Sequence, residues 1–493
     1  MRITLFASAL ALSCAFVACS ESTPAPLSNG TPSDQDGGGN GDTMLGEPAV
    51  ACTDAADAIY GAPGTLPDAK GAIIKCTKDP ELAKDAIQAK LGELGYQGKA
   101  VTSGAKVYRV SYRTERGDAA KTPAVSSAAV YVPTVQRTGK LPVVIAARGS
   151  RGQAAACTAS KLDPVADGVN QDYFRLVYSL VGAGYAVVAP DLAGYANFGA
   201  PGNPPSAYAQ AEDVGKSTLD GGRALKKLFP QLGDKTVIVG HSQGGHSALA
   251  ALALSESYGT EGTIAGVAVY APLWLSQRSW GALLDSGIGA GYPIAGQPSP
   301  NAVSIWYHYT QAELLDGPGE GKKLFAAAKQ DAVKDFVDTQ CWASSYPKLE
   351  ALGTYGYELF DAAFVKAVSA RAAYGGDCDP GSVCEKWIKR YSADRPHITG
   401  AAVKVPILML YGGADTTIPP TRMRCGLDRL KDDGVNLSVC IEASATHGSI
   451  LDMRSSYVAD WLGSVTLGEA APAACAANES AITATCAVPP PND

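Results

Sequence analysis

The sequence predicts an α/β fold, in which a mostly parallel sheet is covered by helices on both faces. Short runs rich in β-branched and apolar residues alternate with amphipathic helical stretches, which is typical of parallel sheets. Of the 493 residues, 46% are hydrophobic and 18% are charged, an ordinary globular composition. The net charge of −7 and the scattered basic residues argue against nucleic acid as a partner.

The first 19 residues are expected to be a signal peptide that directs export. Met1-Arg2 precedes an uncharged apolar run, from Ile3 to Val17, that is too short to span a bilayer. The run ends in Phe16-Val17-Ala18-Cys19, which resembles the lipobox of bacterial lipoproteins. Cys19 is therefore the predicted lipidation site and membrane anchor, with an ordinary secreted protein as the alternative. Either destination, outer-membrane lipoprotein or secreted protein, lies outside the cytoplasm.

The remaining cysteines indicate disulfides. Twelve cysteines, less Cys14 in the leader and Cys19, leave ten, and an even set in an exported chain favours disulfide bonds. Spacing does not fix the connectivity, but four pairs are expected: Cys378 with Cys384, Cys475 with Cys486, Cys425 with Cys440, and Cys157 with Cys341. No Cys-x-x-Cys pair occurs and only five histidines are present, so we expect neither a metal nor a cofactor.

The chain is expected to have six parts. After the leader (1–19), residues 20–48 are rich in Ser, Pro, Gly and Asp and predict a disordered tether. The α/β core comprises residues 49–275 and 401–466, and residues 467–493 form a disulfide-closed tail. The stretch 276–400 is far longer than a crossover needs, and five of the six Trp residues fall at positions 274–387. It predicts either an inserted helical cap that lines a substrate cleft or a small helical domain with its own aromatic core. The two interpretations are compatible, because one domain can do both.

Eight strands and three helices are expected in the core. The strands are expected at 107–113, 125–132, 142–147, 185–190, 236–240, 264–270, 406–411 and 437–442. Helices are expected over 205–229 and 244–256. A third helix is expected to begin at Asp79-Pro80, because Pro suits the first helical position.

One strand, turn and helix carry a candidate nucleophile. The apolar strand over 236–240 runs into Gly240-His241-Ser242-Gln243-Gly244, and a helix follows. In this context the Gly-x-Ser-x-Gly pattern lifts the Ser hydroxyl above the sheet and aims the next backbone N–H at a developing oxyanion. The pattern predicts Ser242 as a nucleophile and Gln243 as an oxyanion-hole donor.

A serine nucleophile needs a base and an acid that orients the base. His447 follows the strand at 437–442, whereas the other histidines lie in the turn after 236–240 or in the insertion. Asp415 leaves the strand at 406–411 in a Gly-rich turn, which gives the chain order Ser, Asp, His of α/β-hydrolases. The plainer interpretations are a surface His and an Asp that caps a helix near Thr421.

Several further segments carry a family resemblance. They are Pro63-Gly64-Thr65-Leu66, the segments 108–113 and 184–191, Cys157-Thr158-Ala159-Ser160, the Gly-His-Ser-Gln-Gly-Gly-His block, and the segment 412–419. Over about residues 60–465 the chain resembles the secretory lipase family of α/β-hydrolases. The resemblance implies an α/β-hydrolase fold with an inserted lid, hydrolysis of an ester or lipid substrate, and a disulfide that ties the Cys157 region toward the lid.

Two loops depart from the family pattern. After the first parallel strand this chain has Arg148-Gly149-Ser150-Arg151, where the family pattern is His-Gly-Thr. After the next strand it has Asp191-Leu192-Ala193-Gly194, where the family pattern is Asp-Tyr-x-Gly. Ser150, or its neighbour, is the expected second oxyanion donor. Arg148 is expected either to form an ion pair with Asp191 or to bind an anionic substrate group. The predicted function is a serine carboxylic ester hydrolase; the alternatives are a serine peptidase and an inactive surface binding protein, and the oligomeric state is not predicted.

Overall fold

A nine-stranded sheet forms the centre of the molecule in the computed structural model, which describes residues 45–161, 171–274, 276–342 and 346–475. In spatial order the strands are β1 (Ile73–Leu82), β2 (Ala105–Glu115), β3 (Pro123–Pro133), β5 (Val187–Pro190), β4 (Val143–Ala147), β6 (Lys235–His241), β7 (Thr263–Tyr270), β8 (Ile407–Gly412) and β9 (Leu437–Glu442). The strands β1, β2, β3 and β5 pair antiparallel with one another in this order, and β5, β4, β6, β7, β8 and β9 form parallel pairs. The predicted α/β class with a mostly parallel sheet is confirmed.

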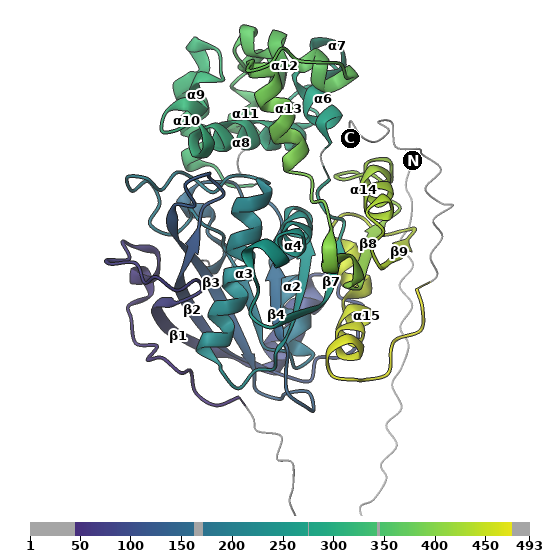
Figure 1. Cartoon of the computed structure of the whole chain (residues 1–493). Helices are drawn as coiled ribbons and strands as arrows, with labels where there is room; N and C mark the ends of the chain where they lie inside the picture. The colour runs from purple at the N-terminus through teal and green to yellow at the C-terminus, as the bar shows by residue number, and fades with distance from the viewer. Residues whose placement is uncertain (1–44, 162–170, 275, 343–345, 476–493) are drawn as a thin grey trace, which may run out of the picture. The chain divides into compact units, whose positions relative to one another are not determined.

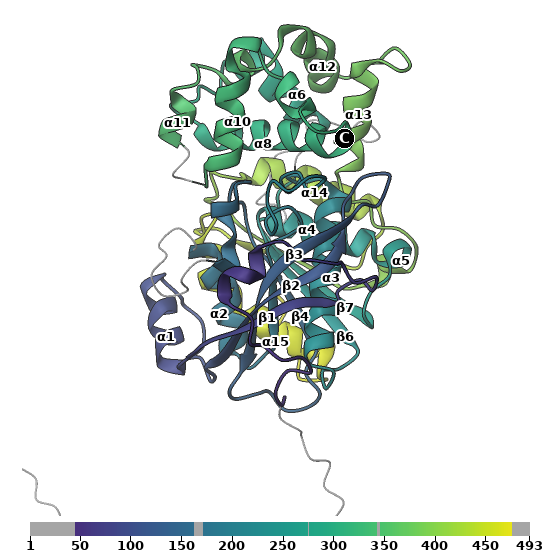
Figure 2. The ribbon, with the colours of Figure 1, turned by 90° about the vertical axis from the view of Figure 1, so that its left-hand side faces the viewer.

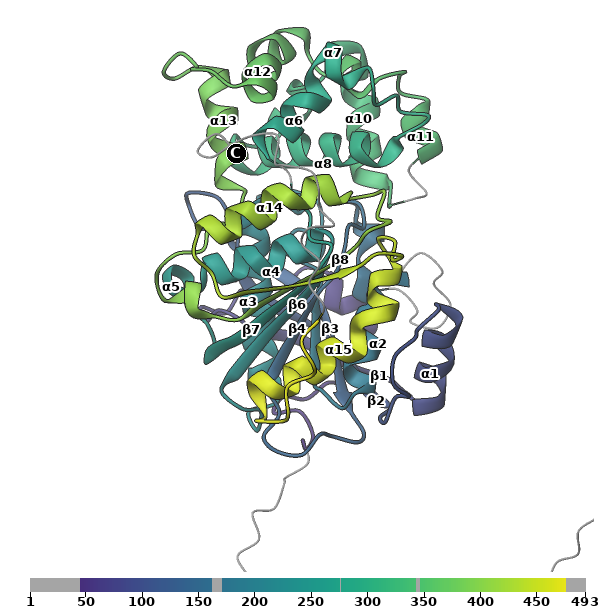
Figure 3. The same ribbon diagram turned by 90° about the vertical axis from the view of Figure 1, so that its right-hand side faces the viewer.

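Helices cover both faces of this sheet, so its central strands are apolar on both sides. All five residues of β4 are buried, as are six of the seven in β6. On one face lie α3 (Ala211–Leu228), α4 (Gln243–Ala253) and α5 (Ser255–Tyr258). On the other lie α1 (Lys84–Glu93), α2 (Gln171–Gly182) and α15 (Ser449–Thr466). Figures 2 and 3 show α14 (Pro420–Asp432) between α4 and a group of helices above it.

That group of helices follows β7 and precedes β8, and we call it the cap (Figure 1). It comprises α6 (Gln277–Leu284), α7 (Ser286–Gly289), α8 (Pro298–Leu315), α9 (Glu320–Lys323), α10 (Gln330–Thr339), α11 (Tyr346–Glu350), α12 (Ala362–Tyr374) and α13 (Val383–Ala393). Trp280, Trp306 and Trp387 are fully buried within it, and the rings of Trp280 and Tyr307 stack with centroids 3.8 Å apart. The aromatic residues of the insertion therefore pack mainly against one another.

Six short 3₁₀ helices complete the described secondary structure. They are Ala56–Tyr60, Ala155–Cys157, Ala159–Lys161, Ala327–Lys329, Gly356–Leu359 and Gly400–Lys404. The helix expected to begin at Asp79-Pro80 is present as α1, but its predicted start is wrong, because strand β1 continues to Leu82 and α1 begins only at Lys84. The Asp79 carboxylate accepts hydrogen bonds from the guanidinium of Arg109 on β2, and the pairing register shifts between Asp79 and Leu82. An irregular edge strand tolerates the missing N–H of Pro80.

The disulfides correct two of the expected pairings. The structure has Cys52–Cys76, Cys157–Cys341, Cys378–Cys384 and Cys440–Cys475. Two of the expected pairs, Cys157–Cys341 and Cys378–Cys384, are confirmed. The pairs Cys425–Cys440 and Cys475–Cys486 are wrong, because Cys440 is bonded to Cys475. Cys440 and Cys475 pack on the face of the sheet that α15 covers, whereas Cys425 packs on the opposite face. Cys425 is itself disulfide-bonded, and Cys486 lies outside the described residues.

The N-terminal predictions fall outside the described residues, which begin at Leu45. They are the signal peptide 1–19, lipidation at Cys19 and most of the tether 20–48. Within the described ranges, no helix has both the length and the apolar character needed to cross a bilayer. The same ranges contain no group of three or more His, Cys, Asp or Glu side chains that could hold a metal ion.

A buried carboxyl group, Asp394, connects the cap to the core. It follows α13, and its Oδ1 accepts the N–H of Ala211 at the start of α3 over 3.0 Å, while Oδ2 accepts the hydroxyl of Tyr307 in α8 over 2.6 Å. Its main-chain oxygen accepts a hydrogen bond from His246 Nε2 in α4 at 2.6 Å. Because Asp394 is only 6% exposed, burial raises the pKa of its carboxyl to about 7.

We predict that Asp394 makes the stability of the protein depend on pH. An unfolded aspartate has a pKa of about 3.9, so between about pH 4 and 7 the folded chain binds more protons at this site than the unfolded chain. The resulting stabilisation is fully present below about pH 4 and is lost as the pH rises through about 7. Urea denaturation at several pH values should show the unfolding free energy of wild type falling, relative to Asp394→Asn, between about pH 5 and 7.5.

A matched control exists in the cap itself. Asp316 accepts hydrogen bonds from Arg390, and although burial opposes it, this pairing leaves the pKa of Asp316 below 3.8. The stability that this paired carboxylate contributes is therefore fully present above the unfolded pKa of about 3.9, and it is lost only as the pH falls below that value. Asp316→Asn should show a difference from wild type that is constant over the same interval. A constant difference for Asp394→Asn as well would contradict the assignment.

Candidate active site

Ser242 occupies the sharp turn between β6 and α4. Its φ of 55° and ψ of −122° form a conformation that residues with a side chain rarely adopt. A Cβ added at Gly240 would lie 2.1 Å from the oxygen of Gly244, and one added at Gly244 would lie 1.9 Å from the oxygen of Ala147. Both glycines of the Gly-x-Ser-x-Gly pattern are therefore required by close backbone approach, and the turn presents Ser242 at the carboxyl end of the parallel strands.

The other two candidate residues lie in loops that follow β8 and β9, at the same end of the sheet. His447 Nδ1 donates a hydrogen bond to Asp415 Oδ2 over 2.7 Å. Asp415 Oδ1 accepts the N–H groups of Thr417 at 2.8 Å and Ile418 at 2.9 Å. The carboxylate thus orients the imidazole ring and holds its own loop. This hydrogen bond places the proton on Nδ1 of a neutral ring and leaves Nε2 able to accept one.

Ser242 and His447 line one cavity of about 370 Å³ without a hydrogen bond between their side chains. Such bonds commonly shorten only when substrate binds. Burial lowers the pKa of His447 below 6.5, although the hydrogen bond to Asp415 opposes this effect. His447 is therefore neutral at neutral pH, as a base must be.

His241, which precedes the nucleophile, has a second role that the sequence did not suggest. Its Nε2 donates to the main-chain oxygen of His447 over 2.9 Å, and its Nδ1 lies 3.5 Å from Asp172 Oδ2. The same Asp172 oxygen accepts the N–H of Gly149 at 3.2 Å. Asp172 and His241 therefore connect the loop after β4, the turn at Ser242 and the loop of His447. No local sequence signal marks Asp172, because it lies in a helix far from the motif.

The loop after β4 supplies the candidate second oxyanion donor. A Cβ added at Gly149 would lie 3.4 Å from the Cβ of Ser242, so this loop closely approaches the nucleophile. The N–H of Gly149 already donates to Asp172, which favours Ser150 over Gly149 as the donor. The hydroxyl of Ser150 shares a hydrogen bond of 2.6 Å with the hydroxyl of Tyr208. Gln243 is the first residue of α4, where backbone N–H groups point away from the helix.

Burial raises the pKa of the Asp191 carboxyl and the charge of Arg148 opposes this effect, but the expected direct ion pair between the two side chains is not formed. The guanidinium of Arg148 donates to the main-chain oxygens of Asp191 at 2.8 Å and Gly149 at 3.0 Å, and lies 4.8 Å from the ring centroid of Tyr195. The Asp191 carboxylate accepts instead from the hydroxyl of Ser127 and the N–H of Ser160. Arg148 is 3% exposed, so it is not available to a substrate.

Two cavities meet at the nucleophile, and Ser150, Ser242 and Trp342 line both of them. The larger, of about 680 Å³, is lined by residues of the cap and of the start of α14. Its apolar wall includes Trp274, Leu283 and Val303. The smaller cavity contains His447 and His241. A ligand bound across Ser242 therefore has two separate spaces, one in each cavity.

A sequence model described as the alpha/beta hydrolase family matches residues 168–460, which is more than half of the chain. The chain belongs to the α/β-hydrolase family. This finding confirms the family expected from the sequence motifs. No curated protein matches the chain in sequence.

Solved α/β-hydrolase structures similar to this chain include lipases and esterases. The closed state of Candida antarctica lipase A has a TM-score of 0.61 and 17% identity, and the match covers 89% of this chain and 91% of that one. A ligand-bound form of the rice cell wall degrading esterase LipA from Xanthomonas oryzae has a TM-score of 0.56 and 18% identity, and the match covers 81% of this chain and 97% of that one. A hydrolase from Legionella pneumophila has a TM-score of 0.60 and 15% identity, and the match covers 81% of this chain and 100% of that one. At these identities the similarity shows the fold alone, and it agrees with the resemblance to lipases.

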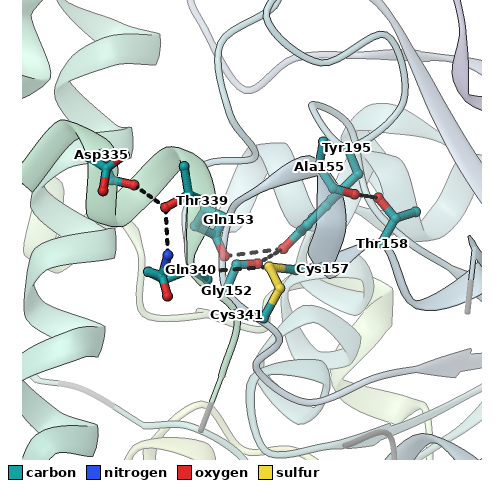
Figure 4. Close-up of a disulfide and its surroundings, with 10 residues drawn as sticks. All are labelled: Gly152, Gln153, Ala155, Cys157, Thr158, Tyr195, Asp335, Thr339, Gln340 and Cys341. Atoms are coloured by element: carbon teal, nitrogen blue, oxygen red, sulfur yellow. Dashed lines mark hydrogen bonds between the residues drawn. A yellow bond between two sulfur atoms is a disulfide. The ribbon is translucent and has the colours of Figure 1, made fainter. Parts of the chain in front are cut away.

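The disulfide Cys157–Cys341 joins the cap of this α/β-hydrolase to the loop after β4 (Figure 4). Beside it, the N–H of Trp342 donates to the main-chain oxygen of Arg151 over 2.8 Å. A Cβ at Gly152 would lie 2.5 Å from the oxygen of Gln340, so the two segments are in direct contact. The expected connection between the Cys157 region and the insertion is confirmed, and it fixes Trp342 at the wall of both cavities.

We predict that this disulfide contributes more stability than the local one in the cap. It closes a loop of 184 residues, for which chain entropy gives about 5 kcal/mol, whereas Cys378–Cys384 closes a loop of 6 residues, worth about 2 kcal/mol. Urea unfolding of the two double Cys→Ser variants should show the larger loss of unfolding free energy for the Cys157/Cys341 variant. Equal losses, or a larger loss for the Cys378/Cys384 variant, would contradict this order.

Proposed function

We propose that the chain is a serine carboxylic ester hydrolase. The observation that carries the proposal is the hydrogen bond of 2.7 Å from His447 to Asp415, in a loop that shares a cavity with the strained Ser242. A buried aspartate that orients a neutral imidazole, in a cavity that the serine also lines, has the arrangement needed to activate a hydroxyl. In this proposal Ser242 is the nucleophile, His447 the base and then the acid, and Asp415 the orienting group.

The reaction proceeds through an acyl-enzyme. His447 Nε2 takes the hydroxyl proton as Ser242 Oγ attacks the ester carbonyl carbon, and the backbone N–H groups of Gln243 and Ser150 stabilise the oxyanion. The intermediate collapses when His447 gives that proton to the leaving alcohol. A water molecule then attacks the acyl-enzyme, with His447 again as base, and releases the carboxylic acid and free Ser242.

In this proposal the two parts of the ester occupy the two cavities. The leaving alcohol receives its proton from His447, so it lies in the smaller cavity, which His447 lines. The acyl group then occupies the larger cavity beneath the cap, whose wall includes Leu283, Tyr292 and Val303. This supports the proposal that residues 276–400 form a lid that selects the acyl group.

The location proposed for this hydrolase is outside the cytoplasm. Its disulfides support an oxidising compartment. Anchoring of the chain to a membrane through a lipid on Cys19 remains part of the proposal. Tethered in this way, the enzyme would meet esters at or outside the cell envelope.

The larger cavity gives no support to the peptidase alternative. An exopeptidase that recognises a free peptide amine needs a carboxylate for that amine, and no Asp or Glu is found among the described residues that line this cavity. The smaller cavity contains Asp172, which is already engaged by His241 and the Gly149 N–H. An assay with aminoacyl anilides beside 4-nitrophenyl esters distinguishes the two activities.

We predict that substitutions at Ser242 and Asp415 reduce the hydrolysis of 4-nitrophenyl butyrate far more than a substitution at another buried acid does. Ser242→Ala should reduce kcat by a factor on the order of 10⁶, and Asp415→Asn by about 10⁴. Asn is chosen because its oxygen can still accept from Thr417 and Ile418. The matched control is Asp452→Asn, because Asp452 is 3% exposed and pairs with Arg175 at 2.8 Å. Near-normal activity of Asp415→Asn together with loss in Asp452→Asn would contradict the acid assignment.

The pH profile of kcat/KM tests the base. His447 must be neutral to accept a proton, so activity falls as the pH falls through its pKa. Because burial lowers that pKa, the acidic limb should lie below pH 6.5. The positive charge on protonated His241 also lowers the pKa of His447, so His241→Gln should move the limb to higher pH. An acidic limb above pH 6.5 in wild type, or one that moves down in His241→Gln, would contradict this assignment.

A further inference from the structure

Arg422 lies in the first turn of α14, in the same cavity as the candidate nucleophile. Asp415 fixes the intervening loop by accepting the N–H groups of Thr417 and Ile418, and Arg422 N–H donates to the oxygen of Pro419 over 2.8 Å. Figures 2 and 3 show α14 directly beneath the cap. The cavity of about 680 Å³ therefore has Ser242 and Arg422 in one continuous lining.

Arg422 is the one charged side chain among the described residues that line this cavity. It is partly buried, and no carboxylate of the described chain lies within 4.0 Å of its guanidinium. The other two arginines of α14 are both paired, since Arg424 contacts Asp428 at 2.7 Å and Arg429 contacts Asp433 at 3.6 Å. Arg422 thus differs from the other arginines of its own helix.

The smaller cavity provides a second comparison. Its two arginines have carboxylate partners, because Arg151 lies 3.8 Å from Asp172 and Arg175 lies 2.8 Å from Asp452. The charges of the smaller cavity are therefore balanced by the protein, whereas that of the larger cavity is not. A guanidinium is suited to bind a carboxylate through two parallel hydrogen bonds.

We propose that the acyl group of the natural substrate carries a carboxylate, and that Arg422 binds it. This inference rests on the proposed ester hydrolysis and on the assignment of the acyl group to the larger cavity. The substrate class is then a monoester of a dicarboxylic acid, whose ester carbonyl lies at Ser242 and whose free carboxylate reaches α14. The same lining also contains the polar side chains of Gln297, Ser299 and Thr421. Hydrolysis releases the alcohol and a dicarboxylate.

Two esters with the same six-carbon acyl chain test the proposal: 4-nitrophenyl hydrogen adipate and 4-nitrophenyl hexanoate. Wild type should show the higher kcat/KM for the adipate ester, and Arg422→Gln should lower the ratio of adipate to hexanoate about tenfold, mainly through KM. Added salt should lower the same ratio in wild type, because Arg422 is partly exposed. The control is Arg424→Gln, which removes a paired cation of the same helix and should leave the ratio at its wild-type value.

The outcomes separate this inference from the proposed function. If hexanoate is cleaved but Arg422→Gln leaves the ratio unchanged, or lowers both rates equally, the carboxylate site is overturned and the hydrolase remains. If neither ester is cleaved, the proposed function fails, and adipate itself becomes the probe of the site. Trp274 and Trp342 line the cavity, so adipate should change tryptophan fluorescence in wild type and not in Arg422→Gln. Equal responses, or none, would overturn the inference.

Discussion

The carboxylate of Asp415 holds together the parts of the candidate site. One of its oxygens accepts a hydrogen bond from His447, and the other accepts the N–H groups of Thr417 and Ile418. This is possible because β8 and β9 are parallel neighbours, so the loops that leave their carboxyl ends meet. The same turn leads into α14 and thereby sets the position of Arg422. A single buried carboxylate therefore determines both the orientation of the proposed base, His447, and one wall of the larger cavity.

The cap is attached to the core at two separated points. Asp394 accepts hydrogen bonds from α3 and α4, and Cys157–Cys341 joins the end of α10 to the loop after β4. Because both connections reach the elements that carry the candidate oxyanion donors, the volume under the cap is determined by the same contacts that organise the chemistry. Substitutions at either connection are expected to affect stability and selectivity together.

The sequence predicted the features that local patterns determine. The strand at β6 and the turn at Ser242 could be predicted because a buried parallel strand is continuously apolar and a tight turn requires glycine. The predictions from sequence were wrong where tertiary contacts determine the extent of a strand or the pairing of cysteines. Edge strand β1 extends through Pro80, and Cys440 pairs across loops with Cys475 because both lie on one face of the sheet. Asp172 and Arg422 could not be found, because only the folded chain shows which charges have partners.

The proposed mechanism depends most on Ser242 being the nucleophile. Intact-protein mass spectrometry after treatment with diethyl 4-nitrophenyl phosphate tests this directly. The reagent phosphorylates a serine only when a neighbouring base activates it. We predict one diethylphosphoryl group per chain, located by peptide mapping on Ser242, and no incorporation in Ser242→Ala. Modification of another residue, or hydrolysis of esters that continues in fully phosphorylated protein, would contradict the account.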